Sequence, residues 1–189
     1  MRSDRASLWF ALTLALLNGL LYVFIVPPWQ HYDEPGHFEY AWLIANHPAL
    51  PQPGDYDQTM RQEVAASMIE HGFYRGIGGL PNLLQSTPIE IGIPQIDDYP
   101  VYYWLAALPL RLLVGNDVTL QLYAARAASL FLFLVSILGG WGLIRELTHP
   151  ESMLRWLIPV CLALLPAYAD IMTAVNNDPK SAVSVKTHP

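Results

Sequence analysis

An uncharged apolar run of nineteen residues, from Leu8 to Val26, constrains the fold of this chain more than any other feature. A helix of that length, at about 1.5 Å rise per residue, covers roughly 28 Å, which matches the hydrocarbon thickness of a bilayer. Arg2 and Arg5 precede the run, so a cleaved signal peptide is the alternative, but Pro27-Pro28-Trp29-Gln30 offers no small-residue cleavage site. The sequence therefore predicts a retained transmembrane helix over about residues 8–27.

Two further apolar stretches, at about residues 120–144 and 156–175, predict two more transmembrane helices. Hydrophobic residues make up 53% of the chain and charged residues 14%, which is typical of an integral membrane protein whose partner is the lipid bilayer. The net charge of −6 argues against a nucleic-acid partner, because phosphate binding relies on clustered Lys and Arg. We therefore expect an all-α integral membrane protein with three transmembrane helices.

A fourth apolar run, from Tyr99 to Val114, has sixteen residues and contains Pro109 and Arg111. This run is short for a full crossing, and a proline inside it disfavours a straight helix. It predicts a juxtamembrane or re-entrant helix, with a fourth span as the alternative.

Arginines near the ends of the predicted spans indicate the topology. Three spans place four of them on one side of the membrane, and the positive-inside rule assigns that side to the cytoplasm. The prediction is a protein of the bacterial plasma membrane, with a cytoplasmic N-terminus and an external segment of about residues 28–118. The four arginines are Arg2, Arg5, Arg145 and Arg155.

The predicted external segment carries two amphipathic helix patterns. From Gly36 to His47, apolar residues recur at i, i+3, i+4 and i+7, and Pro48 ends the pattern. From Asp57 to His71, apolar residues recur every fourth position, with Asp57 as the predicted N-cap and Gly72 just past the end. The stretch from Gly76 to Gln95 is rich in Gly and Pro and predicts a loop.

Short motifs follow one another near the ends of the predicted spans. They are Asp33-Glu34-x-x-His37 with an aromatic helix behind it, Tyr99-Pro100-Val101-Tyr102-Tyr103-Trp104-Leu105, Ala124-Ala125-Arg126-Ala127-Ala128-Ser129 and Val175-Asn176-Asn177-Asp178. In this order they resemble the N-terminal part of polytopic GT-C glycosyltransferases, closest to the dolichyl-phosphate-mannose protein mannosyltransferase-like branch, family 39. On this resemblance, residues 1–178 are a partial GT-C-like membrane module.

The resemblance implies a function in sugar transfer. Such enzymes move a sugar from a polyprenyl-phosphate-linked donor to an acceptor on the external face of the membrane. Residues 179–189 form a polar tail where the family continues as an apolar helix, which suggests a truncated copy, inactive as encoded or in need of a second membrane polypeptide. The alternative is a non-catalytic membrane interaction or assembly subunit.

Three acidic residues are the catalytic candidates that the resemblance implies. In an inverting transfer a carboxylate removes the proton of the acceptor hydroxyl as that oxygen attacks the anomeric carbon. Asp33 matches this general base, Glu34 shares the role or raises its partner's pKa by like-charge repulsion, and Asp178 is the second acidic residue of the site. N-capping of the following helix is the alternative for Asp33, and turn formation is the alternative for residues 176–179. Asp170, inside the third span, ranks below Asp178.

Three further residues are predicted to bind the substrate by the same match. Arg126 would pair with the lipid-linked phosphate, although an arginine that snorkels from a helix end is the alternative. His37 and Asn177 are the other two. His31 and His37 flank the acidic pair, but their spacing fits no strong metal motif, so neither a metal nor another cofactor is expected.

Overall fold

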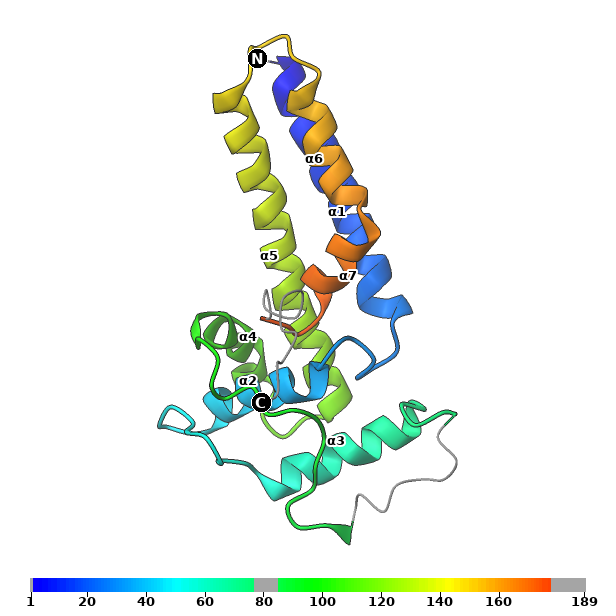
Figure 1. Cartoon of the computed structure of the whole chain (residues 1–189), viewed down its shortest axis with the longest axis vertical. Coiled ribbons are helices and arrows are strands. Elements are labelled where there is room, and N and C mark those ends of the chain that lie inside the picture. The colour runs from blue at the N-terminus through cyan, green and yellow to red at the C-terminus, as the bar shows by residue number, and fades with distance from the viewer. Residues whose placement is uncertain (1, 77–84, 178–189) are drawn as a thin grey trace, which may run out of the picture.

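The structure, a computed structural model, describes residues 2–76 and 85–177 and divides into two regions (Figure 1). One is an elongated bundle of α1, α5, α6 and α7, which we call the stalk. The other, which we call the head, comprises residues 34–76 and 85–117 and contains α2, α3 and α4, and the first turns of α5 pack into its core. The helices are α1 (Arg2–Ile25), α2 (Glu34–Asn46), α3 (Gln58–Glu70), α4 (Val101–Leu112), α5 (Val118–Leu147), α6 (Leu154–Leu164) and α7 (Pro166–Thr173).

The all-α prediction is confirmed, since the described residues contain no strand. Two helices, α1 and α5, are long and apolar enough to cross a membrane, and a third crossing exists if α6 and α7 form one span. The predicted helices at 8–27 and 120–144 coincide with α1 and α5. The apolar run from Tyr99 forms α4, whose twelve residues are too few for a span.

The structure corrects the prediction of the third span. A single helix over 156–175 is wrong, because the chain bends by 62° between α6 and α7. Pro166 is the physical cause, since a proline lacks the N–H that would continue the ladder. The carbonyl of Ala163 is left at the break, and Asn18 Nδ2 of α1 donates to it at 2.9 Å. A side chain of a neighbouring helix thus replaces the lost backbone partner.

Small residues of α1 set the packing of the stalk. Ala11, Ala15, Gly19 and Val23 recur at every fourth position and are all buried. A Cβ added to Gly19 would lie only 2.4 Å from Leu130 Cδ1 of α5. The backbones of α1 and α5 therefore approach closely along this seam, as small residues permit between apolar helices.

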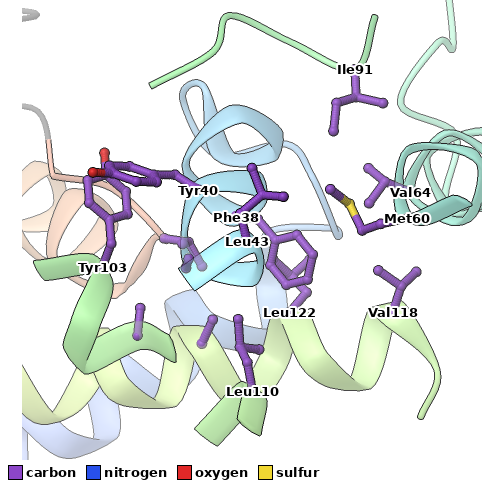
Figure 2. Packing of buried hydrophobic residues seen from close by; sticks show 14 of the residues in the cluster. Phe38, Tyr40, Leu43, Met60, Val64, Ile91, Tyr103, Leu110, Val118 and Leu122 are labelled. Atoms are coloured by element: carbon purple, nitrogen blue, oxygen red, sulfur yellow. The ribbon is translucent and has the colours of Figure 1, made fainter. Parts of the chain in front are cut away.

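The head has its own hydrophobic core, and α2 is buried in it on nearly all sides. Figure 2 shows Phe38 and Leu43 of α2 turned toward Met60 and Val64 of α3. Ten of the thirteen residues of α2 are buried. The sequence predicted an amphipathic helix with one apolar face, and that interpretation is wrong for α2. Trp29 and Val175 also belong to this core, and α4, α5 and the 88–96 segment add Tyr103, Ala106, Ala107, Leu110, Val118, Leu122, Ala125, Ile89, Ile91 and Ile96.

The second predicted amphipathic helix is confirmed as α3. Its apolar face, which includes Met68, is buried against the head core, while Glu63 on the other face is exposed. The backbone N–H of Met60 donates to Asp57 Oδ1 at 2.8 Å, which is the predicted N-cap. Gly72 follows in the left-handed region, with φ at +71°.

Candidate functional site

The segment between α1 and α2, residues 26–33, which we call the connector, holds two residues in a left-handed backbone conformation. Trp29 has φ at +70° and Asp33 at +49°. A positive φ is a strained outlier for a bulky residue such as tryptophan, and it persists only where surrounding contacts enforce it. The Trp29 side chain is fully buried and its Nε1 donates to Ser67 Oγ of α3 at 2.9 Å. This anchor fixes the connector to the head.

Arg126 of α5 fixes the same connector from the stalk side. Its Nε and Nη2 donate to the two carboxylate oxygens of Glu34, each at 2.7 Å, and both side chains are fully buried. The remaining N–H groups donate to the carbonyls of Val23 and Val26 at 2.8 Å and of Pro27 at 3.1 Å. A guanidinium has five N–H donors, and all five are bound here.

These carbonyls explain why the pair is needed. The last turn of a helix leaves carbonyls without an intrahelical partner. Pro27 and Pro28 come one residue after α1 ends and supply no N–H that could satisfy them. Arg126 therefore closes the end of α1, and Glu34 balances its buried charge.

The geometry favours a structural role for this pair over the roles that the motif match implies. The structure brings Glu34 and Arg126 together, so the two side chains satisfy one another. A phosphate bound by Arg126 would have to replace one of its five protein acceptors. The catalytic role of Glu34 and the phosphate-binding role of Arg126 stay predictions.

Asp33 lies at the start of α2, where the sequence allowed capping as its alternative role. Its side chain makes no capping hydrogen bond to the helix. Pro35, in the first turn, lacks one of the N–H groups that a cap would bind, and the Asp33 carbonyl accepts from Gly36 and His37 instead. Asp33 is half-buried, and two residues close to it in sequence have fixed side chains: Glu34 is bound by Arg126, and His31 is bound by Asp170.

The pair of His31 and Asp170 joins the connector to α7. His31 Nδ1 lies 3.0 Å from Asp170 Oδ1 of α7, with the His31 side chain buried and that of Asp170 about half-exposed, at 47%. Burial lowers the pKa of His31, and the neighbouring carboxylates of Glu34 and Asp170 partly offset this by raising it. The structure therefore brings to the site an acidic residue that the sequence ranked low. No group of three His, Cys, Asp or Glu side chains suited to a metal ion occurs in the described part of the chain.

His37 begins a chain of hydrogen bonds one helical turn after Asp33. Its Nδ1 lies 2.7 Å from the hydroxyl of Tyr103, which donates to Asp98 Oδ2 at 3.1 Å. Because the single phenol proton goes to Asp98, His37 Nδ1 is the donor in its own bond. Burial and the charge of Asp98 raise the pKa of Tyr103, which keeps this phenol protonated. Tyr103 belongs to a motif that the sequence singled out, whereas nothing in the sequence marked Asp98 as its partner.

The two motif residues after the third span are placed only in part. Asn177 Nδ2 donates to the carbonyl of Tyr99 at 3.3 Å, and the N–H of Asn176 donates to the Tyr102 hydroxyl at 3.1 Å. These bonds tie the end of α7 to α4. Asp178 lies outside the described residues.

A largely apolar cavity of about 470 Å³ opens between α4, α5 and α7. Its apolar wall includes Leu105, Leu132 and Ile171. Its polar end holds Tyr102 and Ser129, whose hydroxyl groups are 2.7 Å apart. Ser129 follows Arg126 by three residues on α5, so the polar end adjoins the buried pair, one helical turn away.

No protein-family model, curated protein or solved structure matches the chain. The site must therefore be interpreted from its own geometry.

Proposed function

We propose that the chain is an integral membrane protein that carries a sugar-transfer site, with Asp33 as the general base and a polyprenyl-phosphate-linked sugar as the donor. The observation that supports this most is the enforced left-handed conformation of Asp33. Strained residues that neighbouring contacts over-determine cluster at functional sites. Here Arg126, Trp29 and His31 hold the short connector on three sides, and Asp33 is its last residue.

The apolar helices support the spans of the proposed membrane placement, and the arginines near the span ends support its orientation. α1, α5 and the bent pair of α6 and α7 form three spans, the N-terminus is cytoplasmic, and the head lies outside. Asp33 then lies at the external mouth of the stalk. The apolar cavity beside Ser129 lies at the same level and has room for hydrocarbon, which suits a donor that a lipid chain keeps at the membrane.

The proposed reaction is a single inverting displacement. The Asp33 carboxylate accepts the proton of the acceptor hydroxyl, whose oxygen forms a bond to the anomeric carbon. The bond from that carbon to the lipid phosphate oxygen breaks, and the polyprenyl phosphate leaves with the electron pair. His37 lies one turn along α2 from this base, and its hydrogen bond to Tyr103 fixes its ring.

One observation favours a second candidate function, a non-catalytic membrane interaction subunit. Arg126, which pairs with Glu34 next to Asp33, has all five N–H donors bound within the protein. The lipid phosphate would then need a cation from elsewhere. A subunit that displays the head to a partner needs no such group.

The experiment is sugar transfer from radiolabelled polyprenyl-phosphate sugars by membranes that contain this chain. Asp33→Asn is compared with Asp97→Asn, a control at an exposed aspartate of the head. We expect transfer to fall by at least about a hundredfold in Asp33→Asn, as for loss of a general base, and to persist in the control. Equal transfer by both variants would exclude Asp33 as the base. No transfer by any stably inserted form would favour the interaction subunit.

A further inference from the structure

A second cavity, of about 440 Å³, lies in the head on the other side of α2 from Arg126. Its lining includes Asp55, Tyr56, Arg61 and Glu90. A neighbouring cavity of about 370 Å³ shares Asp55 and Tyr56 and adds His47. Tyr56 therefore lines both cavities, which together form one extended surface that we call the head groove.

Arg61 gives the head groove hydrogen-bond donors that the protein does not use. Its side chain is only 9% exposed and pairs with Glu39 through Nε and Nη2, while Nη1 donates to the carbonyl of Ile89 at 2.9 Å. These bonds occupy three of the five N–H groups of a guanidinium. The other two, on the terminal nitrogens, have no acceptor in the described part of the chain. A buried cation that keeps unused donors at a cavity wall is suited to a ligand.

The remaining side chains indicate the chemistry of that ligand. The Tyr56 ring lies 4.8 Å from Arg61 Cζ, is 42% exposed and offers a flat apolar surface. Asp55 and Glu90 supply carboxylate acceptors. Glu39 already balances the charge of Arg61, so the groove carries excess negative charge and disfavours a phosphate. A sugar ring presents an apolar face with hydroxyl groups that both donate and accept, and it matches all three kinds of group.

The head groove adjoins the proposed catalytic residue. A Cβ added to Gly36 would meet the carbonyl oxygen of Ile93, and one added to Gly92 would lie 3.6 Å from Pro35 Cβ. The 88–96 segment, which forms one wall of the groove, therefore crosses the first turn of α2. Asp33 immediately precedes that turn.

We propose that the head groove binds a neutral saccharide and that Tyr56 and Arg61 are its main contacts. In naming this saccharide as the acceptor, the inference rests on the proposed function. The acceptor would extend from the groove toward Asp33, with its reacting hydroxyl at the mouth of the stalk. The saccharide site itself requires no transfer reaction.

The test measures equilibrium binding to the full chain in lipid nanodiscs, without any donor lipid. The probes are short oligomers of mannose, glucose and N-acetylglucosamine, with inorganic phosphate as the anionic comparison. We expect at least one neutral series to bind, and Tyr56→Ala to weaken that binding about tenfold, because the stacking surface is lost. Tyr56→Phe keeps the ring and should retain the affinity. Tyr99→Ala removes a more exposed tyrosine, 79% exposed against 42% for Tyr56, that lies outside the groove, and it should change nothing.

The outcomes separate this inference from the proposed function. Binding that depends on Tyr56, in a protein that transfers no sugar, would support the saccharide site and count against the transferase. Transfer that depends on Asp33, with an acceptor KM unchanged in Tyr56→Ala, would overturn the inference alone. The inference also fails if phosphate binds in place of the neutral oligomers, or if none of the oligomers binds to a folded wild-type protein.

Discussion

The two arginine–glutamate pairs of α2 differ in how completely they are bonded. Glu34 pairs with Arg126, whose five N–H groups all have protein acceptors, and neither side chain is exposed. Glu39 pairs with Arg61, which uses three donors and lines a cavity. The same chemical pair thus closes a helix end in one place and presents donors to a ligand space in the other. The number of satisfied donors, more than burial, distinguishes the structural pair from the functional candidate.

Their spacing explains how one helix serves both regions. Glu34 and Glu39 are five residues apart, about 140° around a helix, so they point to different sides of α2. One side meets α5 of the stalk and the other meets α3 of the head. The helix is therefore held between two buried charges, which accounts for its nearly complete burial.

Removal of Arg126 should have the largest effect. Arg126→Met leaves Glu34 as an uncompensated buried charge and removes one hydrogen bond from each of three carbonyls, so we expect a loss of about 3–5 kcal/mol in the free energy of unfolding. Chemical denaturation in detergent measures it. Glu34→Gln in the same chain should restore part of the loss. The matched control is Arg111→Met, at an exposed arginine, and it should cost at most about 1 kcal/mol. Equal losses at both arginines would contradict the comparison.

Arg61→Met should cost less, about 2–3 kcal/mol, because Arg61 is bound through fewer donors and lines a cavity. The same denaturation series compares the two arginines directly. A loss as large as that of Arg126→Met would show that Arg61 is a structural residue of the same kind, and would weaken its assignment to the head groove.

Gly36→Ala tests how the 88–96 segment is held over α2. The new methyl group would collide with the carbonyl oxygen of Ile93, so the segment must shift, at a cost of about 1–3 kcal/mol. Saccharide binding in the head groove should weaken with it. Gly139→Ala, where an added Cβ meets nothing within 4 Å, should leave stability unchanged or raise it slightly. If Gly36→Ala left the free energy of unfolding unchanged, the 88–96 segment would not be in close contact with α2.

The pair between His31 and Asp170 predicts the smallest effect, a dependence of stability on pH. Burial lowers the pKa of His31 below its usual 6.5, so the unfolded chain binds the proton more readily than the folded chain. Stability from this group is complete above pH 6.5 and falls as the pH drops toward the lowered pKa. Melting temperatures measured between pH 7.5 and 5 should decrease, and the decrease should be shallower in His31→Gln. The same slope in both proteins would remove His31 as its source.

The long apolar helices could be predicted from the sequence, because a long run without charges is itself a local signal for a helix in apolar surroundings. The Asp57 cap was likewise local and correctly predicted. The burial of α2 could not be predicted, because it depends on contact with the 88–96 segment, and the Gly and Pro content of that segment indicated only a loop. The pairing of Glu34 with Arg126 joins residues 92 positions apart, and no local pattern encodes such a contact. The bend before α7 had a visible signal in Pro166, which the apolar composition of the run outweighed.

The hydrogen bond from Asn18 to Ala163 has a consequence for how the protein is made. A backbone carbonyl without a partner costs several kcal/mol in hydrocarbon, so the bent third segment is poorly suited to enter a bilayer by itself. Its partner is a side chain of α1, synthesised 145 residues earlier. If α6 and α7 form one span, we therefore expect that span to insert stably only beside α1, which would couple assembly of the stalk to the order of translation.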